Sequence, residues 1–136
     1  MPQREDQLLI HGPGWRPDVV ARLGLDESRD RLLADFCEHW QVAELELFGS
    51  VLRTDFRSDS DVDVLVTFLP DADWGLIEHA AMEEELAGLL GRPVDLLTRR
   101  AVERSANQAR RASILTDAIP LLSISTKTAA TERVKT

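Results

Sequence analysis

The chain has 136 residues, of which 43% are hydrophobic and 29% charged, the composition of one globular domain with a single hydrophobic core. Its formal net charge of −8 argues against a general nucleic-acid binder, because phosphate backbones are bound through clustered Lys and Arg side chains. We therefore expect no direct nucleic-acid binding, and we expect basic proteins or metal ions as partners.

Residue usage narrows the chemistry further. No apolar run is long enough for a signal sequence or a membrane span, which predicts a cytoplasmic protein without membrane association. The only cysteine, Cys37, excludes an internal disulfide, and its place in an apolar helical pattern indicates a buried residue rather than a nucleophile. Lysine occurs only at Lys127 and Lys135, so arginine side chains and backbone N–H groups must make any phosphate contact in the folded part.

The first 25 residues show no regular hydrophobic period, and we interpret them as an N-terminal extension. The Gly-Pro-Gly run at 12–14 predicts a loop or turn, with one short helical piece after Pro17. From Asp26 or Ser28, either of which is a suitable N-cap, apolar residues recur at helical spacing and predict an amphipathic helix of about three turns. Its apolar residues are Leu32, Leu33, Phe36, Cys37 and Trp40.

Beyond residue 41, strand and helix patterns alternate along the chain. Apolar residues at every second position predict strands, and apolar residues at helical spacing predict helices. Gly91, followed by Pro93, ends the first of these helices. The predicted elements are strands at 42–48, 61–68 and 94–97, helices at 74–90 and 102–119, a polar connection at 49–60 and a disordered tail at 123–136. The folded domain is therefore placed at 26–122.

This order of elements predicts an α/β (α+β) fold, with a small mixed sheet of about three strands flanked by helices. The helix at 74–90 connects two strands as a crossover, so the strands at 61–68 and 94–97 should be parallel. Gly49 ends the first strand and must meet Asp61 at the start of the second, so these two strands should be antiparallel.

One motif carries chemistry. Gly49 and Ser50 are followed, after ten residues, by Asp61 and Asp63, in the pattern G-S-x10-D-x-D. Residues i and i+2 of a strand point to the same face, so the two carboxylates lie side by side, about 7 Å apart at the Cα atoms, and can bind divalent cations. Glycine at 49 lets the backbone approach phosphates closely, and the Ser50 hydroxyl can donate to them. Asp95 would add a third carboxylate if its strand lies beside Asp61 and Asp63.

The stretch LFGSVLRTDFRSDSDVDVLV, residues 47–66, closely resembles the signature of the polymerase-β-like nucleotidyltransferase superfamily. More narrowly, the chain resembles the minimal nucleotidyltransferase (MNT) antitoxins that are encoded beside HEPN-domain toxins. The resemblance covers roughly residues 28–121, and it implies the nucleotidyltransferase fold. The chain departs from the family at Thr54, where members often have glycine.

The resemblance also implies roles for the site residues. Asp61 and Asp63 would bind magnesium, Asp95 would complete the metal site and activate the acceptor, and two magnesium ions are expected. Gly49, Ser50 and Arg53 would bind the nucleotide, with ATP as the substrate. The implied activity is transfer of AMP to a hydroxyl, with tyrosine as the expected acceptor, on a HEPN-type ribonuclease toxin that is thereby neutralised in a hetero-oligomer.

Each candidate residue also has a purely structural interpretation. Asp61 and Asp63 are compatible with an ordinary turn, Asp95 with a solvated edge strand, and Arg53 with a surface ion pair to Asp55. Further arginines form either a basic patch near the site or a solvated helix face, and they are Arg99, Arg100, Arg104, Arg110 and Arg111. If Asp95 is not the third ligand, Glu44 and Glu46 of the first strand are the next candidates.

Two other functions remain open from the sequence. The first is a binding-only antitoxin that blocks its partner sterically and keeps the carboxylates without using them. The second is a nucleotidyltransferase that modifies a small molecule, with the acceptor site formed at a homodimer interface. The short chain favours an acceptor that is brought by another protein, because the catalytic core leaves little room for an acceptor-binding domain.

Overall fold

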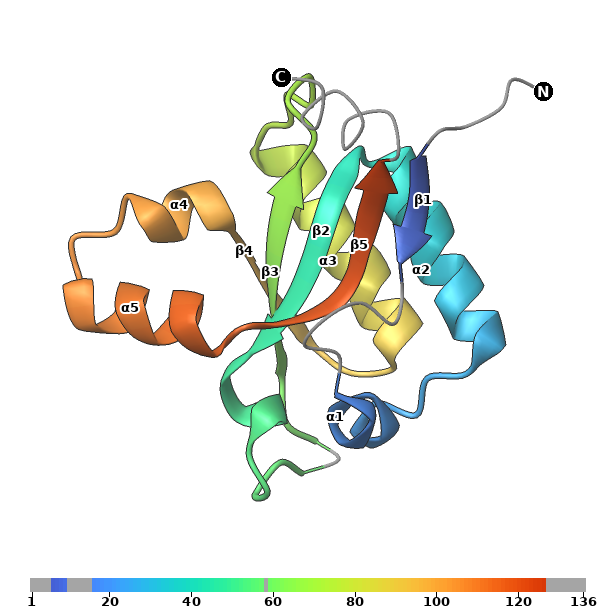
Figure 1. The fold of residues 1–136 in the computed structure, drawn as a ribbon, viewed down its shortest axis with the longest axis vertical. Helices are drawn as coiled ribbons and strands as arrows, with labels where there is room; N and C mark the ends of the chain where they lie inside the picture. The colour runs from blue at the N-terminus through green and yellow to red at the C-terminus, as the bar shows by residue number, and fades with distance from the viewer. Residues whose placement is uncertain (1–5, 10–15, 58, 127–136) are drawn as a thin grey trace.

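The computed structural model describes residues 6–9, 16–57 and 59–126 of the chain. The strands in these residues are β1 (Asp6–Leu9), β2 (Val42–Phe48), β3 (Val62–Phe68), β4 (Val94–Thr98) and β5 (Ile119–Thr126). The helices are α1 (Pro17–Arg22), α2 (Glu27–His39), the 3-10 helix η1 (Gly49–Leu52), α3 (Leu76–Leu90), α4 (Arg99–Glu103) and α5 (Gln108–Asp117). The strands form one mixed sheet in the order β1-β5-β2-β3-β4 (Figure 1).

The helices begin and end at residues whose chemistry favours these boundaries. Asp26 caps α2, because its Oδ1 accepts a hydrogen bond of 2.9 Å from the backbone N–H of Arg29. Helix α3 ends at Gly91, whose φ of 71° is the left-handed conformation that glycine adopts readily. Helix α1 confirms the helical piece predicted after Pro17. No helix in the described part of the chain is long and apolar enough to cross a membrane.

The pairing of the three central strands confirms the predicted mixed sheet. Strand β2 is antiparallel to β3, and β3 is parallel to β4 through the crossover helix α3. The ends of β2 and the starts of β3 and β4 therefore meet at one edge of the sheet. This is the edge at which the sequence places Gly49, Asp61, Asp63 and Asp95.

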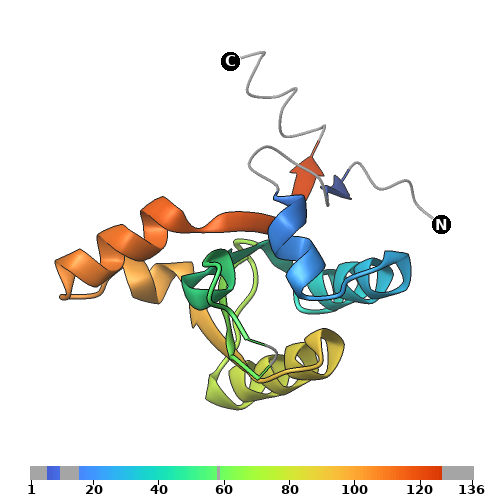
Figure 2. The ribbon, with the colours of Figure 1, turned by 90° about the horizontal axis from the view of Figure 1, so that it is seen from below.

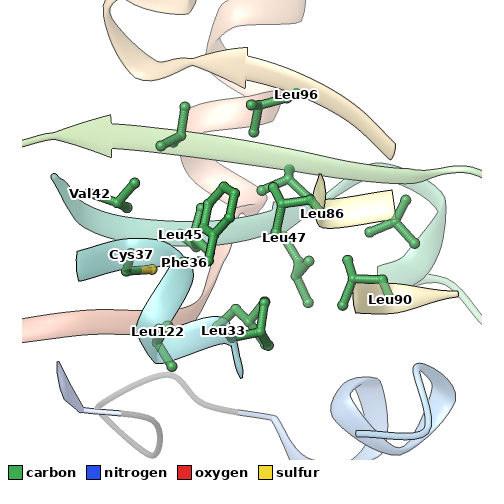
Figure 3. Packing of buried hydrophobic residues seen from close by; sticks show 14 of the residues in the cluster. Leu33, Phe36, Cys37, Val42, Leu45, Leu47, Leu86, Leu90, Leu96 and Leu122 are labelled. Carbon is green, nitrogen blue, oxygen red and sulfur yellow. The ribbon is translucent and has the colours of Figure 1, made fainter. Parts of the chain in front are cut away.

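The two faces of the sheet pack against different helices (Figure 2). On one face, Leu45 and Leu47 of β2 join a buried cluster with Leu33 and Phe36 of α2 and Leu86 of α3 (Figure 3). The opposite face is covered in part by α4 and α5 through a smaller cluster. Its buried members are Phe48, Leu65, Val102 and Ile114. The residues of β2 and β3 that face α4 and α5 alternate with those of the larger core, which places Asp63 on the α4 and α5 side.

Side chains of α3 cover the outer edge of β4 at its centre. The backbone N–H of Leu96 donates to Glu83 Oε2 at 2.8 Å, and the carbonyl of Leu96 accepts from His79 Nε2 at 2.8 Å. Strand β4 is the last strand on its side of the sheet, so these groups would otherwise have no strand partner.

The C-terminal part of the chain differs from the sequence prediction. The helix predicted at 102–119 is two helices, because Asn107 starts a new one by accepting a hydrogen bond of 3.0 Å from the backbone N–H of Arg110. The sheet has five strands rather than about three, since β5 and β1 were not predicted. The disorder predicted from residue 123 is wrong for 123–126, which belong to β5.

The strand β5 lies between β1 and β2, so a segment predicted to contain the end of a helix and the start of a disordered tail occupies an interior position of the sheet. Its pairing with β2 is irregular at Pro120, which lacks the N–H that a regular ladder requires. Strand β1 comes from the predicted N-terminal extension and pairs with the end of β5. The loop predicted at 12–14 and residues 127–136 lie outside the described residues, and the domain limits of 26–122 remain a prediction.

Candidate active site

Gly49 and Asp63 form the centre of the site. Gly49 follows the last residue of β2, and Phe48 at that end is the ladder partner of Asp63 in β3. Gly49 has a φ of 76°, a backbone conformation that residues other than glycine rarely adopt. A Cβ atom at this position would also overlap Asp63 Oδ2. Position 49 therefore requires glycine for its backbone conformation and for the close approach of the aspartate.

The three predicted carboxylates lie at one end of β3 and β4. Asp63 and Asp95 are direct partners in the parallel ladder, and Asp61 immediately precedes β3. Asp63 is half-buried, and its pKa is raised above the usual value by burial and by the negative charges of Asp95 and Asp61. The predicted adjacency of Asp63 and Asp95 is confirmed, because it follows from the parallel pairing of their strands.

These carboxylates fit a magnesium ion by the chemistry of their donor atoms. Carboxylate oxygens are the hard ligands that magnesium prefers, and the mutual repulsion that raises the pKa of Asp63 is the kind that a cation relieves. Within the described residues, no three Asp, Glu, His or Cys side chains are already gathered around one metal position. The roles of Asp61, Asp63 and Asp95 as metal ligands thus remain a prediction.

A cavity of about 690 Å³ opens beside Asp63. Three of the predicted site residues, Gly49, Arg53 and Asp63, line it, whereas Ser50, Asp61 and Asp95 do not. Arg53 also lies 3.4 Å from Asp55 Oδ1, so its two predicted interpretations, cavity residue and surface ion pair, are compatible in this structure. The volume is within the range of about 300–1,000 Å³ that is typical of small-molecule sites.

The cavity has a second wall that the motif does not contain. It consists of Arg16, before α1, and of polar residues on α5, namely Arg110, Ser113, Thr116 and Asp117. Arg110 was one of five arginines considered for a basic patch, and the structure separates it from the others by placing it at the cavity. No sequence signal distinguished Arg16, because it lies in a segment without regular pattern.

The alternative acidic residues of β2 are in different surroundings. Glu46 is buried and forms an ion pair of 2.5 Å with Arg99, so its carboxylate is already neutralised by a cation. The pKa of Glu44 is raised, first by burial and then by the charge of Glu46. Asp95 is the direct ladder partner of Asp63, which favours it over Glu44 and Glu46 as the third member of the carboxylate group.

Comparison with known families and structures agrees with this geometry. The family model for the nucleotidyltransferase domain matches residues 29–122, and the chain therefore belongs to the nucleotidyltransferase domain family. Among curated proteins, the protein adenylyltransferase MntA of Thermococcus cleftensis is 36% identical over 89 residues, which cover 62% of this chain and 86% of that protein.

Solved structures share the fold of this chain. A structure assigned as a minimal nucleotidyltransferase is 32% identical, has a TM-score of 0.54, and matches 81% of this chain and 100% of its own. A toxin-antitoxin structure with AMP-PNP has a TM-score of 0.53 and 22% identity, over 71% of this chain and 73% of the other. At that identity the second likeness shows the fold alone. The resemblance stated from residues 47–66 is confirmed at the level of family and fold.

Proposed function

We propose that this protein is a magnesium-dependent protein adenylyltransferase and an antitoxin. It transfers AMP from ATP to a hydroxyl, with tyrosine as the first acceptor to test, of a HEPN-type ribonuclease toxin and thereby neutralises the toxin. The observation that carries the proposal is the placement of Gly49 and Asp63 together at a cavity large enough for a nucleotide, with Asp95 beside Asp63 in the neighbouring strand. The adenylyltransferase name of the relative from Thermococcus cleftensis supports the nucleotide.

Each part of the site has a role in this reaction. Gly49 and Ser50 approach the phosphates, and Arg53 and Arg110 supply positive charge at the cavity. Asp61, Asp63 and Asp95 would hold magnesium, which when bound neutralises phosphate charge and makes the acceptor hydroxyl more acidic. The hydroxyl oxygen forms a bond to the α-phosphorus and loses its proton, while the bond from that phosphorus to the pyrophosphate breaks and pyrophosphate leaves.

A protein acceptor agrees with two properties of the chain. The sequence contains no tyrosine, so a tyrosine acceptor must belong to another molecule. The net charge of −8 complements the basic surface that an RNA-binding toxin needs, which favours rapid and selective association. The close approach of Gly49 to Asp63 favours a catalytic role, because a binding-only antitoxin does not require it.

The test uses α-labelled ATP, magnesium and a purified HEPN-type toxin. We expect wild-type protein to label the toxin, and we expect Asp63→Asn to abolish the label. Asp95→Asn should keep the affinity for an ATP analogue but slow single-turnover transfer by about two or more orders of magnitude. Asp35→Asn, which changes an exposed carboxylate on α2, is the matched control and should transfer normally.

The outcomes separate the three functions. Inhibition of the toxin without any label would support a binding-only antitoxin. Label that appears on a small hydroxyl compound in the absence of toxin would support the small-molecule enzyme. Normal labelling by Asp63→Asn would contradict the catalytic role of the carboxylates.

A further inference from the structure

The segment that contains α1 lies outside the region matched by the nucleotidyltransferase family model, which begins at residue 29. Arg16, which immediately precedes this helix, nevertheless lines the same cavity as Gly49 and Asp63. Val19 of α1 is fully buried and belongs to the main hydrophobic core. The α1 segment is therefore packed into the domain beside the candidate site.

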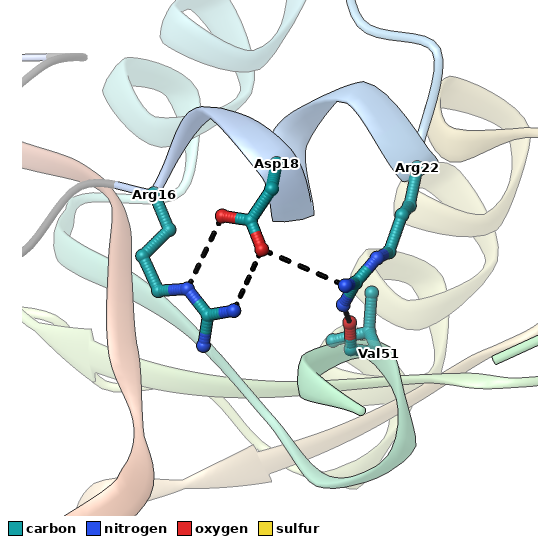
Figure 4. A network of polar contacts seen from close by, with 4 residues as sticks. All are labelled: Arg16, Asp18, Arg22 and Val51. Carbon is teal, nitrogen blue, oxygen red and sulfur yellow. Dashed lines mark hydrogen bonds and ion pairs between the residues drawn. The ribbon is translucent and has the colours of Figure 1, made fainter. Parts of the chain in front are cut away.

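A pair of hydrogen bonds fixes the orientation of Arg16 (Figure 4). Its Nε donates to Asp18 Oδ1 at 3.2 Å, and its second guanidinium nitrogen donates to Asp18 Oδ2 at 2.7 Å. This two-point contact holds the planar guanidinium in one direction and leaves its other N–H groups available. The side chain of Arg16 keeps 41% of its surface exposed, so it can still bind a ligand.

A second contact ties this arrangement to the Gly-Ser turn. Arg22 donates a hydrogen bond of 2.7 Å to the carbonyl of Val51 in η1 and lies 3.5 Å from Asp18 Oδ2 (Figure 4). Val51 is fully buried and follows Gly49 by two residues in the same 3-10 helix. Asp18 and Arg22 thus connect Arg16 to the turn that we assign to the phosphates.

The charges around the cavity show what ligand Arg16 suits. The acidic residues that line the cavity are Asp63 and Asp117, and the cations Arg16, Arg53 and Arg110 come from three separate parts of the chain. Arginine binds phosphate oxygens through parallel, charge-assisted N–H donors, which give both binding energy and geometric specificity. Three arginines at one cavity therefore favour a ligand with several negative charges, such as a triphosphate, over a monophosphate.

We propose that Arg16 binds the β- and γ-phosphates of ATP and that Asp18 is a positioning residue that holds it for this purpose. The inference rests on the proposed function, since it takes ATP as the ligand. It adds to the family's site a phosphate contact from residues that precede the matched region. Arg22 links this contact to the Gly-Ser turn.

Calorimetric titration of the full-length protein with a non-hydrolysable ATP analogue and, separately, with AMP tests the inference. We expect Arg16→Gln to weaken binding of the ATP analogue by about 10- to 100-fold, the loss typical of a hydrogen bond to a charged group, and to leave AMP binding unchanged. Arg31→Gln removes an exposed arginine of α2 outside the cavity and should bind both ligands like wild type.

The role of Asp18 is tested by a double-mutant cycle with the same ligands. Asp18→Asn should weaken binding of the ATP analogue in the wild-type background and have no further effect in the Arg16→Gln background. If Asp18 supported only the fold, its effect would be the same in both backgrounds and would extend to AMP. That result would overturn its positioning role.

The result for wild type separates the two proposals. If wild-type protein does not bind the ATP analogue, the proposed function and this inference both fail. If wild type binds and Arg16→Gln binds equally well, only the inference fails. Equal losses for the ATP analogue and AMP in Arg16→Gln would also overturn it, because a phosphate contact must distinguish the two ligands.

Discussion

Gly49 and Asp63 constrain each other at the level of single residues. The glycine leaves room for the carboxylate, and the carboxylate is held close to the backbone at the point where phosphates are expected. Its raised pKa shows that burial and neighbouring acids disfavour its negative charge in the free protein. The site therefore holds electrostatic strain that a bound cation would relieve.

Cys37 provides a test of burial that is independent of the site. It is 1% exposed, and burial raises the pKa of its thiol from 9.0 to about 12. Because the folded-state pKa is the higher one, the stability gained from the protonated thiol is fully present below pH 9.0 and is lost as the pH rises toward 12. The chain has no tyrosine, and its lysines are Lys127 and Lys135, so few other groups titrate in this window.

We expect the free energy of unfolding of wild type to fall between about pH 8 and about pH 11, by at most about 2.7 kcal/mol, because about two pKa units at 1.36 kcal/mol each lie between the unfolded value of 9.0 and about pH 11. Cys37→Ala should be less stable at about pH 8, because it leaves a cavity, but should lose less stability on alkalinisation. Urea unfolding of both proteins at the two pH values measures the difference. Parallel losses would show that the thiol is not shielded.

The sequence could predict the residues of the site that lie in one local motif. Gly49, Ser50, Asp61 and Asp63 follow from spacing, and Asp95 follows from the rule that a helical crossover joins parallel strands. Arg16 and Arg110 could not be predicted as cavity residues, because their positions depend on how α1 and α5 pack against the sheet. Such packing is a long-range property that no local pattern encodes.

At the scale of elements, the connection between η1 and β3 is held by one arginine from another part of the chain. Arg92, in the turn after α3, places its guanidinium carbon 4.7 Å from the centre of the Phe56 ring. It also donates a hydrogen bond of 3.0 Å to the carbonyl of Arg57. These contacts hold the part of the connection at Phe56 and Arg57, which precedes Asp61.

We expect Arg92→Gln to loosen this connection and to slow adenylyl transfer, because Asp61 and Arg53 lie on it. Limited proteolysis with trypsin measures the loosening directly, since Arg53 and Arg57 are cleavage sites within the connection. Cleavage there should be about 10-fold faster than in wild type, as for a loss of about 1.4 kcal/mol in local stability. Arg31→Gln, on α2, is the control. Equal cleavage rates in both variants would show that Arg92 does not hold the connection.

The elements that were predicted correctly have strong local signals, and those that were missed do not. Helices α2 and α3 have long apolar stripes with caps, and β2 and β3 alternate clearly. Strand β1 has only four residues, and β5 contains Pro120, so neither has a clear pattern of its own. Their status as strands depends on pairing with each other and, for β5, with β2.

At the scale of the whole molecule, the sheet is completed by segments from both ends of the described chain. The family-matched region, 29–122, contains neither α1 nor β1 and ends within β5. It also lacks Val19 and Leu23, which are buried in the main core, and Asp26, which caps α2. A protein cut at these limits would lose part of its main hydrophobic core and the N-cap of α2.

We expect a chain of residues 29–122 to be less stable than one of residues 16–126 by about 4–7 kcal/mol. The estimate combines about 1.5–3 kcal/mol for each buried apolar side chain with about 1 kcal/mol for the cap. Urea unfolding followed by tryptophan fluorescence measures this difference, because Trp40 and Trp74 are present in both chains and contact each other with ring centres 5.1 Å apart. Equal midpoints and slopes would show that α1 and the end of β5 contribute nothing.

The capped edge of β4 has a consequence for the behaviour of the protein at high concentration. An open strand edge is a template on which other molecules can add strands and aggregate. Here Glu83 and His79 of α3 occupy the backbone groups of Leu96, so the sheet cannot be extended from one molecule to the next at that residue. Leu76 and Ile77, at the start of α3, are 88% and 83% exposed. The structure therefore opposes fibril-like pairing of backbones at the centre of this strand, while the apolar side chains exposed at the start of α3 remain open to contacts that dilution can reverse.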